Sequence, residues 1–318
     1  MTKQTVISAS SPSFVIVDEN HLGQRLDNYL MRILKGVPKS RIYRIIRKGE
    51  VRVNKKRAKP DQRLGTGDEI RVPPIQLMEP QAVTQPKKGL STQIEQQIQY
   101  EDDNLIVVNK PSGIAVHGGS GVNFGVIELL RISRPNAKFL ELVHRLDRET
   151  SGCLLIAKKP SVLKHLHELL RIGGVDKRYF AVVKGHWPKK QTQVSAPLLK
   201  YQTRSGERIV TINAEQGKAS LTEFHVLQYF ENCTLLEAIP QTGRTHQIRV
   251  HAAYMQHPIA GDEKYGDKEF NKEMRAVGLK RLFLHAASLS FPLANAGKEI
   301  AVSSELDEDM NAVLKRLR

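Results

Sequence analysis

The sequence predicts an α+β protein, with a mixed, largely antiparallel sheet in its larger part and a small α+β module at its N-terminus. The chain of 318 residues, 40% of them hydrophobic, is long enough for two domains, one with a large core. Strand pairs joined by short turns outnumber strand–helix–strand crossovers, which favours antiparallel pairing. We expect a module over residues 21–75, a polar linker containing prolines over 76–99, and a second domain over 100–318.

Charge is concentrated in the first of these parts. Residues 21–74 contain 15 Lys and Arg against 5 Asp and Glu, so they carry a net charge of +10 out of the chain's +16. Such a density indicates a polyanionic partner, and RNA is favoured over a membrane because no apolar stretch approaches bilayer length. A generic solvated basic face is the alternative, and it does not explain why the charge is local.

Two helices are predicted at the start of the module. Apolar residues at helical spacing over 26–34 form one amphipathic stripe, which ends at Gly36. Ser40 can cap a second helix over 41–48, and Gly49 ends it. Isoleucines of the second helix face inward, so its cations project outward.

Two short strands follow, because apolar and polar residues alternate over 51–54 and again over 69–72. Between them lies a basic turn, 55–57. The run from Arg25 through 44–54 to 67–70 resembles the RNA-binding module of small-subunit ribosomal protein four. This resemblance implies contact with phosphates of structured RNA. The predicted RNA contacts are Lys39, Arg41, Arg44, Arg47, Lys48, Lys55 and Lys56.

The larger domain alternates apolar strands with amphipathic helices. Strand patterns predict a hairpin that turns at 231–232, and a strand over 177–185 that carries Tyr179. A lone tyrosine on a strand is more often a core residue than a catalytic one. The other expected strands span 105–108, 152–157, 282–291 and 299–302, and the expected helices span 126–132, 161–171, 245–255 and 307–317.

One carboxylate stands between two guanidiniums at the entrance to the strand over 152–157. Asp147 has Arg145 and Arg148 on either side, and flanking cations favour the ionised form of a carboxylate. Such an aspartate suits attack on an electrophile better than proton donation. The alternative is a surface loop in which the aspartate only pairs with arginine to end a strand.

A second polar cluster, over 242–251, places Arg244, His246 and Arg249 near the start of a predicted helix. The helix dipole favours an anion there, so we expect a phosphate or carboxylate. A metal site is not favoured, because His246 and His251 are five positions apart and do not share one helix face. Cys153 and Cys233 indicate reduced core thiols.

Together, the motifs His144-Arg-Leu-Asp-Arg, Lys177-Arg-Tyr and 243–251 resemble those of the RluA-type pseudouridine synthases. The resemblance implies isomerisation of uridines in large-subunit ribosomal RNA or its precursor particle. It also implies Asp147 as the catalytic carboxylate, Tyr179 against the uracil, and Arg249 paired with Asp147. Further substrate or RNA contacts are expected at Lys110, His117, Arg145, Arg148, Arg244 and His246.

The chemistry agrees with this interpretation. The reaction moves a base from nitrogen to carbon attachment without redox change, so no cofactor and no metal are expected. The glycine-rich run 118–125 is neither a P-loop nor a Rossmann fingerprint, and it indicates an RNA-facing turn. An ionised Asp147 would either attack the anomeric carbon or remove a proton from the neighbouring ribose carbon.

Two alternatives stay open. A nucleoside hydrolase would need a second carboxylate to activate water, and Glu149 is the candidate. A non-enzymatic RNA-binding or ribosome-assembly factor would use Asp147 only structurally. The N-terminal residues 1–14 lack the pattern of a secretory signal, so we expect a cytoplasmic protein, and a monomer without membrane contact.

Overall fold

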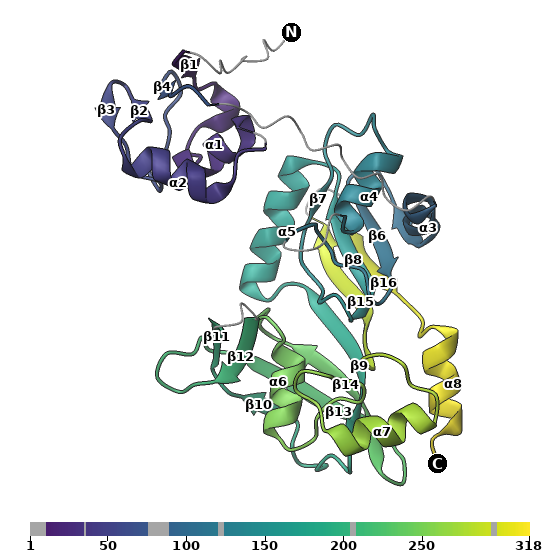
Figure 1. Cartoon of the computed structure of the whole chain (residues 1–318). Coiled ribbons are helices and arrows are strands. Elements are labelled where there is room, and N and C mark those ends of the chain that lie inside the picture. The colour runs from purple at the N-terminus through teal and green to yellow at the C-terminus, as the bar shows by residue number, and fades with distance from the viewer. Residues whose placement is uncertain (1–10, 35, 76–88, 120–123, 204–207, 294–297) are drawn as a thin grey trace. The chain divides into compact units, whose positions relative to one another are not determined.

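The chain divides into two compact units, residues 1–85 and 86–318, and each has its own hydrophobic core (Figure 1). This computed structural model describes residues 11–34, 36–75, 89–119, 124–203, 208–293 and 298–318. The predicted α+β class is confirmed in both units.

The N-terminal unit packs two helices against a small antiparallel sheet. Helix α1 spans Leu26–Ile33 and helix α2 spans Lys39–Arg47, and their apolar faces bury Leu26, Leu30, Ile42 and Ile46. Helix α2 begins at Lys39 after Pro38, so Ser40 is not its cap. The sheet has the order β1-β4-β2-β3, with β1 at Ser13–Ile16, β2 at Arg52–Val53, β3 at Lys56–Arg57 and β4 at Glu69–Val72.

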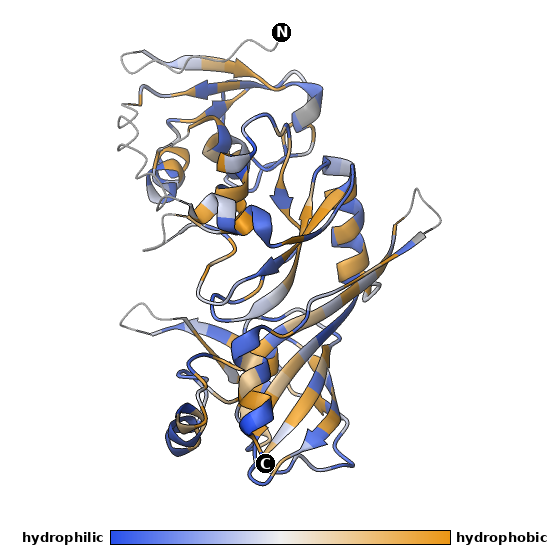
Figure 2. Ribbon diagram, turned by 90° about the vertical axis from the view of Figure 1, so that its right-hand side faces the viewer, coloured by the Kyte–Doolittle hydropathy of each residue, from blue (hydrophilic) through white to orange (hydrophobic). Residues whose placement is uncertain are grey.

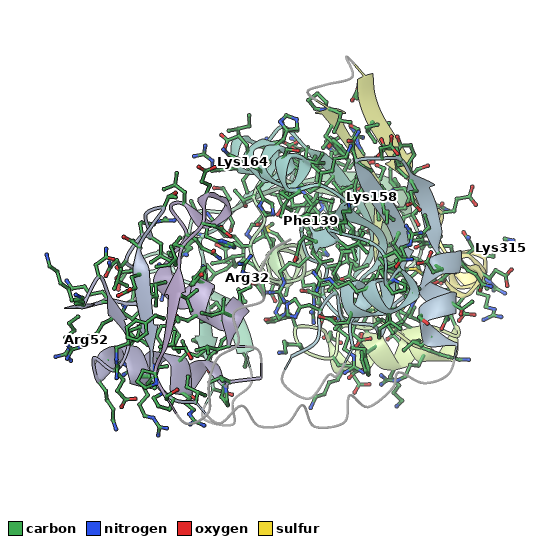
Figure 3. The ribbon with its side chains drawn as sticks, turned by 90° about the horizontal axis from the view of Figure 1, so that it is seen from above. Arg32, Arg52, Phe139, Lys158, Lys164 and Lys315 are labelled. Atoms are coloured by element: carbon green, nitrogen blue, oxygen red, sulfur yellow. The ribbon has the colours of Figure 1, made fainter. Side chains whose placement is uncertain are left out.

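Two predictions about this unit are wrong in detail. The module does not begin at residue 21, because β1 pairs with β4 and adds the strand Ser13–Ile16 to the sheet. The basic turn is also shorter than predicted: Asn54 and Lys55 adopt left-handed backbone angles and form the turn, while Lys56 and Arg57 belong to β3. The cations of these strands still project outward, as Arg52 does in Figure 3.

The linker predicted over 76–99 is wrong in its second half. Residues 76–88 lie outside the described residues, but Leu90–Gln96 forms helix α3 and β5 begins at Ile98. Helix α3 belongs to the core, since Ile94 is fully buried. Arg134 forms a salt bridge with Glu95 of this helix, with an Nε–Oε1 distance of 2.7 Å. A single buried residue in an otherwise polar helix left too weak a periodic signal.

The C-terminal unit is built on a ten-stranded sheet with the strand order β10-β13-β14-β9-β15-β8-β6-β5, to which β16 and β7 are attached at the side. Of the described strand pairs, β8 with β15 is parallel and the others are antiparallel, so the largely antiparallel prediction is confirmed. The central strands are β6 (Leu105–Lys110), β8 (Ser151–Ala157), β9 (Asp176–Lys184), β14 (Cys233–Pro240) and β15 (Leu284–Leu293). The outer strands are β5 (Ile98–Glu101), β7 (Glu141–Leu142), β10 (Gln193–Ser195), β13 (Leu221–Tyr229) and β16 (Lys298–Ser303).

Helices cover both faces of this sheet, because alternate residues of its central strands are buried on opposite sides. Ile106 and Val108 of β6 face the cluster of α3 and α4 (Val126–Ser133), whereas Leu105 and Val107 face α5 (Pro160–Ile172). In the other half, Ala181 and Val183 pack with α6 (Gln247–Tyr254). On the opposite face, Val182 packs with α7 (Lys268–Ala276) and α8 (Glu308–Arg316). Figure 2 shows the mixed orange and blue bands of amphipathic helices.

Several elements were not predicted. Besides α3 and α7, the hairpin of β11 (Leu198–Gln202) and β12 (Arg208–Ile212) forms a separate two-stranded sheet, and β10 is a short edge strand. Helix α6 begins at Gln247, two residues later than expected. In the part of the chain that the structure describes, no helix is long and apolar enough to cross a bilayer.

Candidate active site

A pocket of about 410 Å³ opens where β8, β9 and α6 meet. Its volume lies in the range of small-molecule sites. Three distant segments supply most of its wall: residues 144–150 before β8, Lys177 and Tyr179 on β9, and 240–249 leading into α6. The end of α5 adds His167, Leu170 and Arg171.

Asp147 lies in this pocket, at the start of the turn that leads into β8. Its side chain is 19% exposed, and its Oδ2 lies 3.3 Å from Nη1 of Arg249 and 3.8 Å from Nε2 of His246. The backbone N–H of Thr150 donates to the carbonyl of Asp147, which closes the turn. A partly exposed carboxylate held by a guanidinium can react with a ligand without a large rearrangement.

Arg249 is held in turn by a second carboxylate, Asp262. Its Nε and Nη2 donate to the two oxygens of Asp262 at 2.7 and 2.8 Å, and the Asp262 side chain is 1% exposed. Burial disfavours the charged form of both groups, but their mutual hydrogen bonds and charge attraction have the larger effect. The pKa of Arg249 is therefore raised and that of Asp262 is lowered. Asp262 was not predicted, although a buried arginine requires a carboxylate partner of this kind.

Tyr179 stands on the opposite wall, next to Ala238 and Ala286 on the neighbouring strands. It packs against the core clusters on both sides of the pocket. Burial raises its pKa, and the charge of Asp147 adds to the effect, so the phenol keeps its proton near neutral pH. The ring is therefore an aromatic wall rather than a ready base.

The arginines beside Asp147 in sequence do not pair with it. Arg148 donates from Nε to the carbonyl of Gly113 and lies 3.6 Å from Glu149. Arg145 is exposed at the pocket wall. The prediction that these two cations hold Asp147 is wrong, because the described ion pairs of Asp147 are with Arg249 and His246. The cation at Asp147 comes instead from Arg249, 102 positions away in sequence.

Lys110 is another wrong prediction, because it is fully buried and does not face RNA. Its ammonium donates to the carbonyls of Pro111, Ile114 and Arg148 at 2.8, 2.9 and 3.0 Å. Burial lowers its pKa to about 7. The lysine thus ties the turn after β6 to the turn that carries Asp147.

The two further histidines of the motifs bond within the protein, and His144 is half-buried at the pocket wall. His144 accepts a hydrogen bond from the backbone of Leu155, and burial lowers its pKa to about 4. His251 is fully buried between Ser220 and Thr222. Near the start of the predicted helix, Arg249 contacts two protein carboxylates, Asp147 and Asp262.

The remaining predicted contacts lie at the surface. Arg244 is exposed at the pocket wall, where its Nε donates to the carbonyl of Ala219. His117 is exposed beside Gly118, whose N–H donates to Glu128 of α4. The rest of the glycine-rich turn, 120–123, lies outside the described residues. Of the RNA contacts predicted in the N-terminal unit, Arg41 is half-buried, and the exposed ones are Lys39, Arg44, Arg47, Lys48, Lys55 and Lys56.

Both cysteines are free and buried, as the sequence predicts. Burial raises the pKa of Cys233 to about 11 and that of Cys153 to about 12, so neither is a reactive thiolate at neutral pH. Over the ranges that the structure covers, no group of three His, Cys, Asp or Glu residues is placed to hold a metal ion.

The chain combines a basic helical module with a mixed sheet, and the pocket of the sheet holds a carboxylate paired with arginine. This organisation is that of an RNA-modifying enzyme. Comparisons with known proteins agree. Residues 104–254 match the family described as RNA pseudouridylate synthase, and residues 24–70 match the S4 domain. The chain belongs to the family of RNA pseudouridine synthases, which are isomerases.

Two full-length relatives are named ribosomal large subunit pseudouridine synthase C. The protein of Haemophilus influenzae is 55% identical over 100% of this chain and 99% of its own length. That of Escherichia coli K12 is 52% identical over 97% of each. Among solved structures, human RNA pseudouridylate synthase domain containing 4 is 28% identical and covers 72% of this chain and 96% of its own, with a TM-score of 0.60.

Proposed function

We propose that the protein isomerises specific uridines of large-subunit ribosomal RNA, free or in a precursor particle, with Asp147 as the catalytic carboxylate. The observation that carries the proposal is the Asp147 carboxylate in a pocket, paired with Arg249 and faced by an aromatic ring. The names of the relatives support the substrate, and the basic N-terminal unit supports binding to RNA.

The reaction breaks the bond from the ribose anomeric carbon to N1 of uracil and forms a bond from that carbon to C5. C5 then loses its proton and N1 gains one, so the atoms balance without an electron acceptor. Asp147 acts either by attacking the anomeric carbon or by removing a proton from the adjacent ribose carbon. In both routes the detached uracil has to stay in the pocket, where Tyr179 provides a stacking wall after the nucleotide has been flipped from its helix.

The competing hydrolase requires a second carboxylate near the substrate. Glu149 does not supply it, because its side chain is 49% exposed beside Arg148 and does not line the pocket. Asp262 does not supply it either, since both of its oxygens are bound to Arg249. Retention of the base is therefore favoured over its release to water.

The proposal extends to the rest of the chain. The N-terminal unit binds RNA through its exposed cations, while Arg145, Arg244, His117 and His246 contact the substrate near the pocket. We also propose that the protein acts as a monomer in the cytoplasm.

Replacement of Asp147 by asparagine tests the proposal. Asp147→Asn should lower the isomerisation rate by about 10⁴-fold or more, as loss of an essential catalytic group does. RNA affinity should be retained. The measurement is pseudouridine formation on a ribosomal RNA fragment, with a binding assay on the same RNA.

Glu149→Gln is the matched control, because it removes an exposed carboxylate only two residues away. We expect it to keep the wild-type rate. Substantial activity in Asp147→Asn would refute the catalytic role, and release of free uracil by the wild type would favour the hydrolase.

A further inference from the structure

Two donors converge on the same oxygen of Asp147. Nη1 of Arg249 and Nε2 of His246 both approach Oδ2, at 3.3 and 3.8 Å. Within the described residues no hydrogen bond ends on Oδ1. We propose that His246 is a positioning residue that, with Arg249, turns Oδ2 away from the substrate and leaves Oδ1 for the reaction. The inference rests on the proposed catalytic role of Asp147.

Tyr265 decides which nitrogen of His246 carries the proton. Its hydroxyl oxygen lies 2.7 Å from Nδ1 of His246 and accepts a hydrogen bond from the backbone N–H of Val210 at 3.0 Å. The hydroxyl has one proton to donate, and among the described residues Nδ1 of His246 is the acceptor within its reach. Nδ1 is then the acceptor, and the ring proton lies on Nε2.

The charge of Asp147 favours the same tautomer independently. With the proton on Nε2, an N–H bond faces Oδ2, whereas the other tautomer would direct a nitrogen lone pair at a carboxylate. At 3.8 Å the contact is too long for a hydrogen bond but short enough for electrostatic attraction. Catalytic hydrogen bonds often shorten to normal length only when the substrate is bound.

His246 is also a neutral group. Burial lowers its pKa, and the nearby charges of Arg249 and Lys264 act in the same direction, against Asp147 and Asp262. A neutral Nε2–H orients the carboxylate without adding a second full positive charge, which would make Asp147 a poorer nucleophile or base.

The backbone around His246 is adapted to this position. The residue precedes α6 in a left-handed conformation, with φ at 54°, and its ring lies edge-on to Tyr265 at a centroid distance of 5.5 Å. A non-glycine residue in this region is strained, and strain of this kind clusters at functional sites. The left-handed backbone also matters for the test, because asparagine tolerates it better than glutamine does.

Tyr265→Phe is the first test, since it removes the hydroxyl and keeps the ring. ¹⁵N NMR of histidine-labelled protein should show the Nε2–H tautomer of His246 in the wild type and a mixture in the variant. The kcat of isomerisation should fall about tenfold, the equivalent of one hydrogen bond, while the KM for RNA stays unchanged. Tyr254→Phe is the control, because it removes the hydroxyl of a tyrosine on α6 that is 56% exposed. It should change neither the tautomer of His246 nor the kcat.

A pair of substitutions at His246 keeps the test valid if Tyr265→Phe is destabilised. The amide nitrogen of glutamine takes the place of Nε2, whereas that of asparagine reaches only the place of Nδ1. His246→Gln should therefore retain more activity than His246→Asn, although asparagine suits the backbone better. The inverse order, or an Nδ1–H tautomer in the wild type, would overturn the inference.

The two proposals can fail separately. The tautomer is measured without turnover, so it is independent of the role of Asp147. Suppose that Asp147→Asn keeps its activity while His246 shows the Nε2–H form. The tautomer would then be correct, but the catalytic role of Asp147 would be refuted, and so would the role of His246 in positioning it for catalysis. In the background of Asp147→Asn, adding Tyr265→Phe should lower the residual rate no further, and an additional loss of about tenfold would contradict positioning through Asp147.

Discussion

At the scale of single residues, Arg249 contacts two carboxylates with very different geometry. It grips buried Asp262 with two short hydrogen bonds and touches partly buried Asp147 with one longer contact. Removing the partner of a buried charge is costly, but Asp262 remains in place when Asp147 moves. Arg249 therefore keeps a partner when the charge of Asp147 is used in the reaction, and no unpaired guanidinium is left in the pocket.

His144 makes stability depend on pH. Its pKa of about 4 in the folded protein lies below the 6.5 of an unperturbed histidine, so the unfolded chain takes up the proton first as pH falls. Between pH 6.5 and pH 4 the wild type should lose up to about 3 kcal/mol of unfolding free energy through this group. Urea unfolding across this range measures the loss.

His144→Gln is the comparison for that experiment. Its side-chain oxygen can accept the hydrogen bond from Leu155, and it does not titrate. The difference in stability between wild type and variant should shrink or change sign as pH falls. A difference that stays constant with pH would show that His144 is not buried in its neutral form.

The sequence predicted which residues share the pocket better than it predicted which side chains pair with one another. Asp147, Tyr179 and Arg249 were predicted to share a site, and the structure places all three in one pocket. Sequence neighbours were misleading, because Arg145 and Arg148 flank Asp147 and yet form no ion pair with it in the described part of the chain. Asp262 and Tyr265 were missed since nothing local tells a lone aspartate or tyrosine which distant side chain it will meet.

At the scale of elements, α2 presents its cations on the face opposite its buried isoleucines. Reversing two charges on this helix, with Arg41→Glu and Arg44→Glu together, should weaken binding of structured RNA about tenfold or more at low salt. The slope of affinity against salt concentration should become shallower by about one for each phosphate that the helix no longer neutralises. Turnover on a short minimal substrate should not change.

Lys315→Glu is the matched control, because Lys315 is an exposed cation at the surface of α8 (Figure 3). It should leave both affinity and salt dependence close to wild type. An equal weakening in the control would show that only overall charge matters. Unchanged affinity in the α2 variant would argue against this helix as an RNA-binding surface.

Elements with strong periodicity were predicted well, including β6, β8, α5 and the hairpin of β13 and β14. The missed ones are short or highly charged: α3 has one fully buried side chain, and α7 is rich in charged residues. Strand order was not predictable either. The pairing of β15 with both β8 and β9 depends on how side chains pack across the whole sheet, and no local pattern in the sequence indicates it.

At the scale of the whole molecule, each unit has a separate hydrophobic core. Removing residues 1–85 should therefore leave a folded protein that retains activity on a short substrate and binds large ribosomal RNA more weakly. Cooperative thermal unfolding and the two activity assays check this. Loss of the cooperative transition would show that the second unit depends on the first.

Strand β15, near the end of the chain, lies between the strand that follows Asp147 and the strand that carries Tyr179. During synthesis on the ribosome, both of those strands emerge long before the strand that joins them. The pairing is long-range, so it is a late step in folding. Because Leu284 of this strand also lines the pocket, a nascent chain that has not yet released residues 284–293 lacks part of the pocket wall and the strand that joins its two halves.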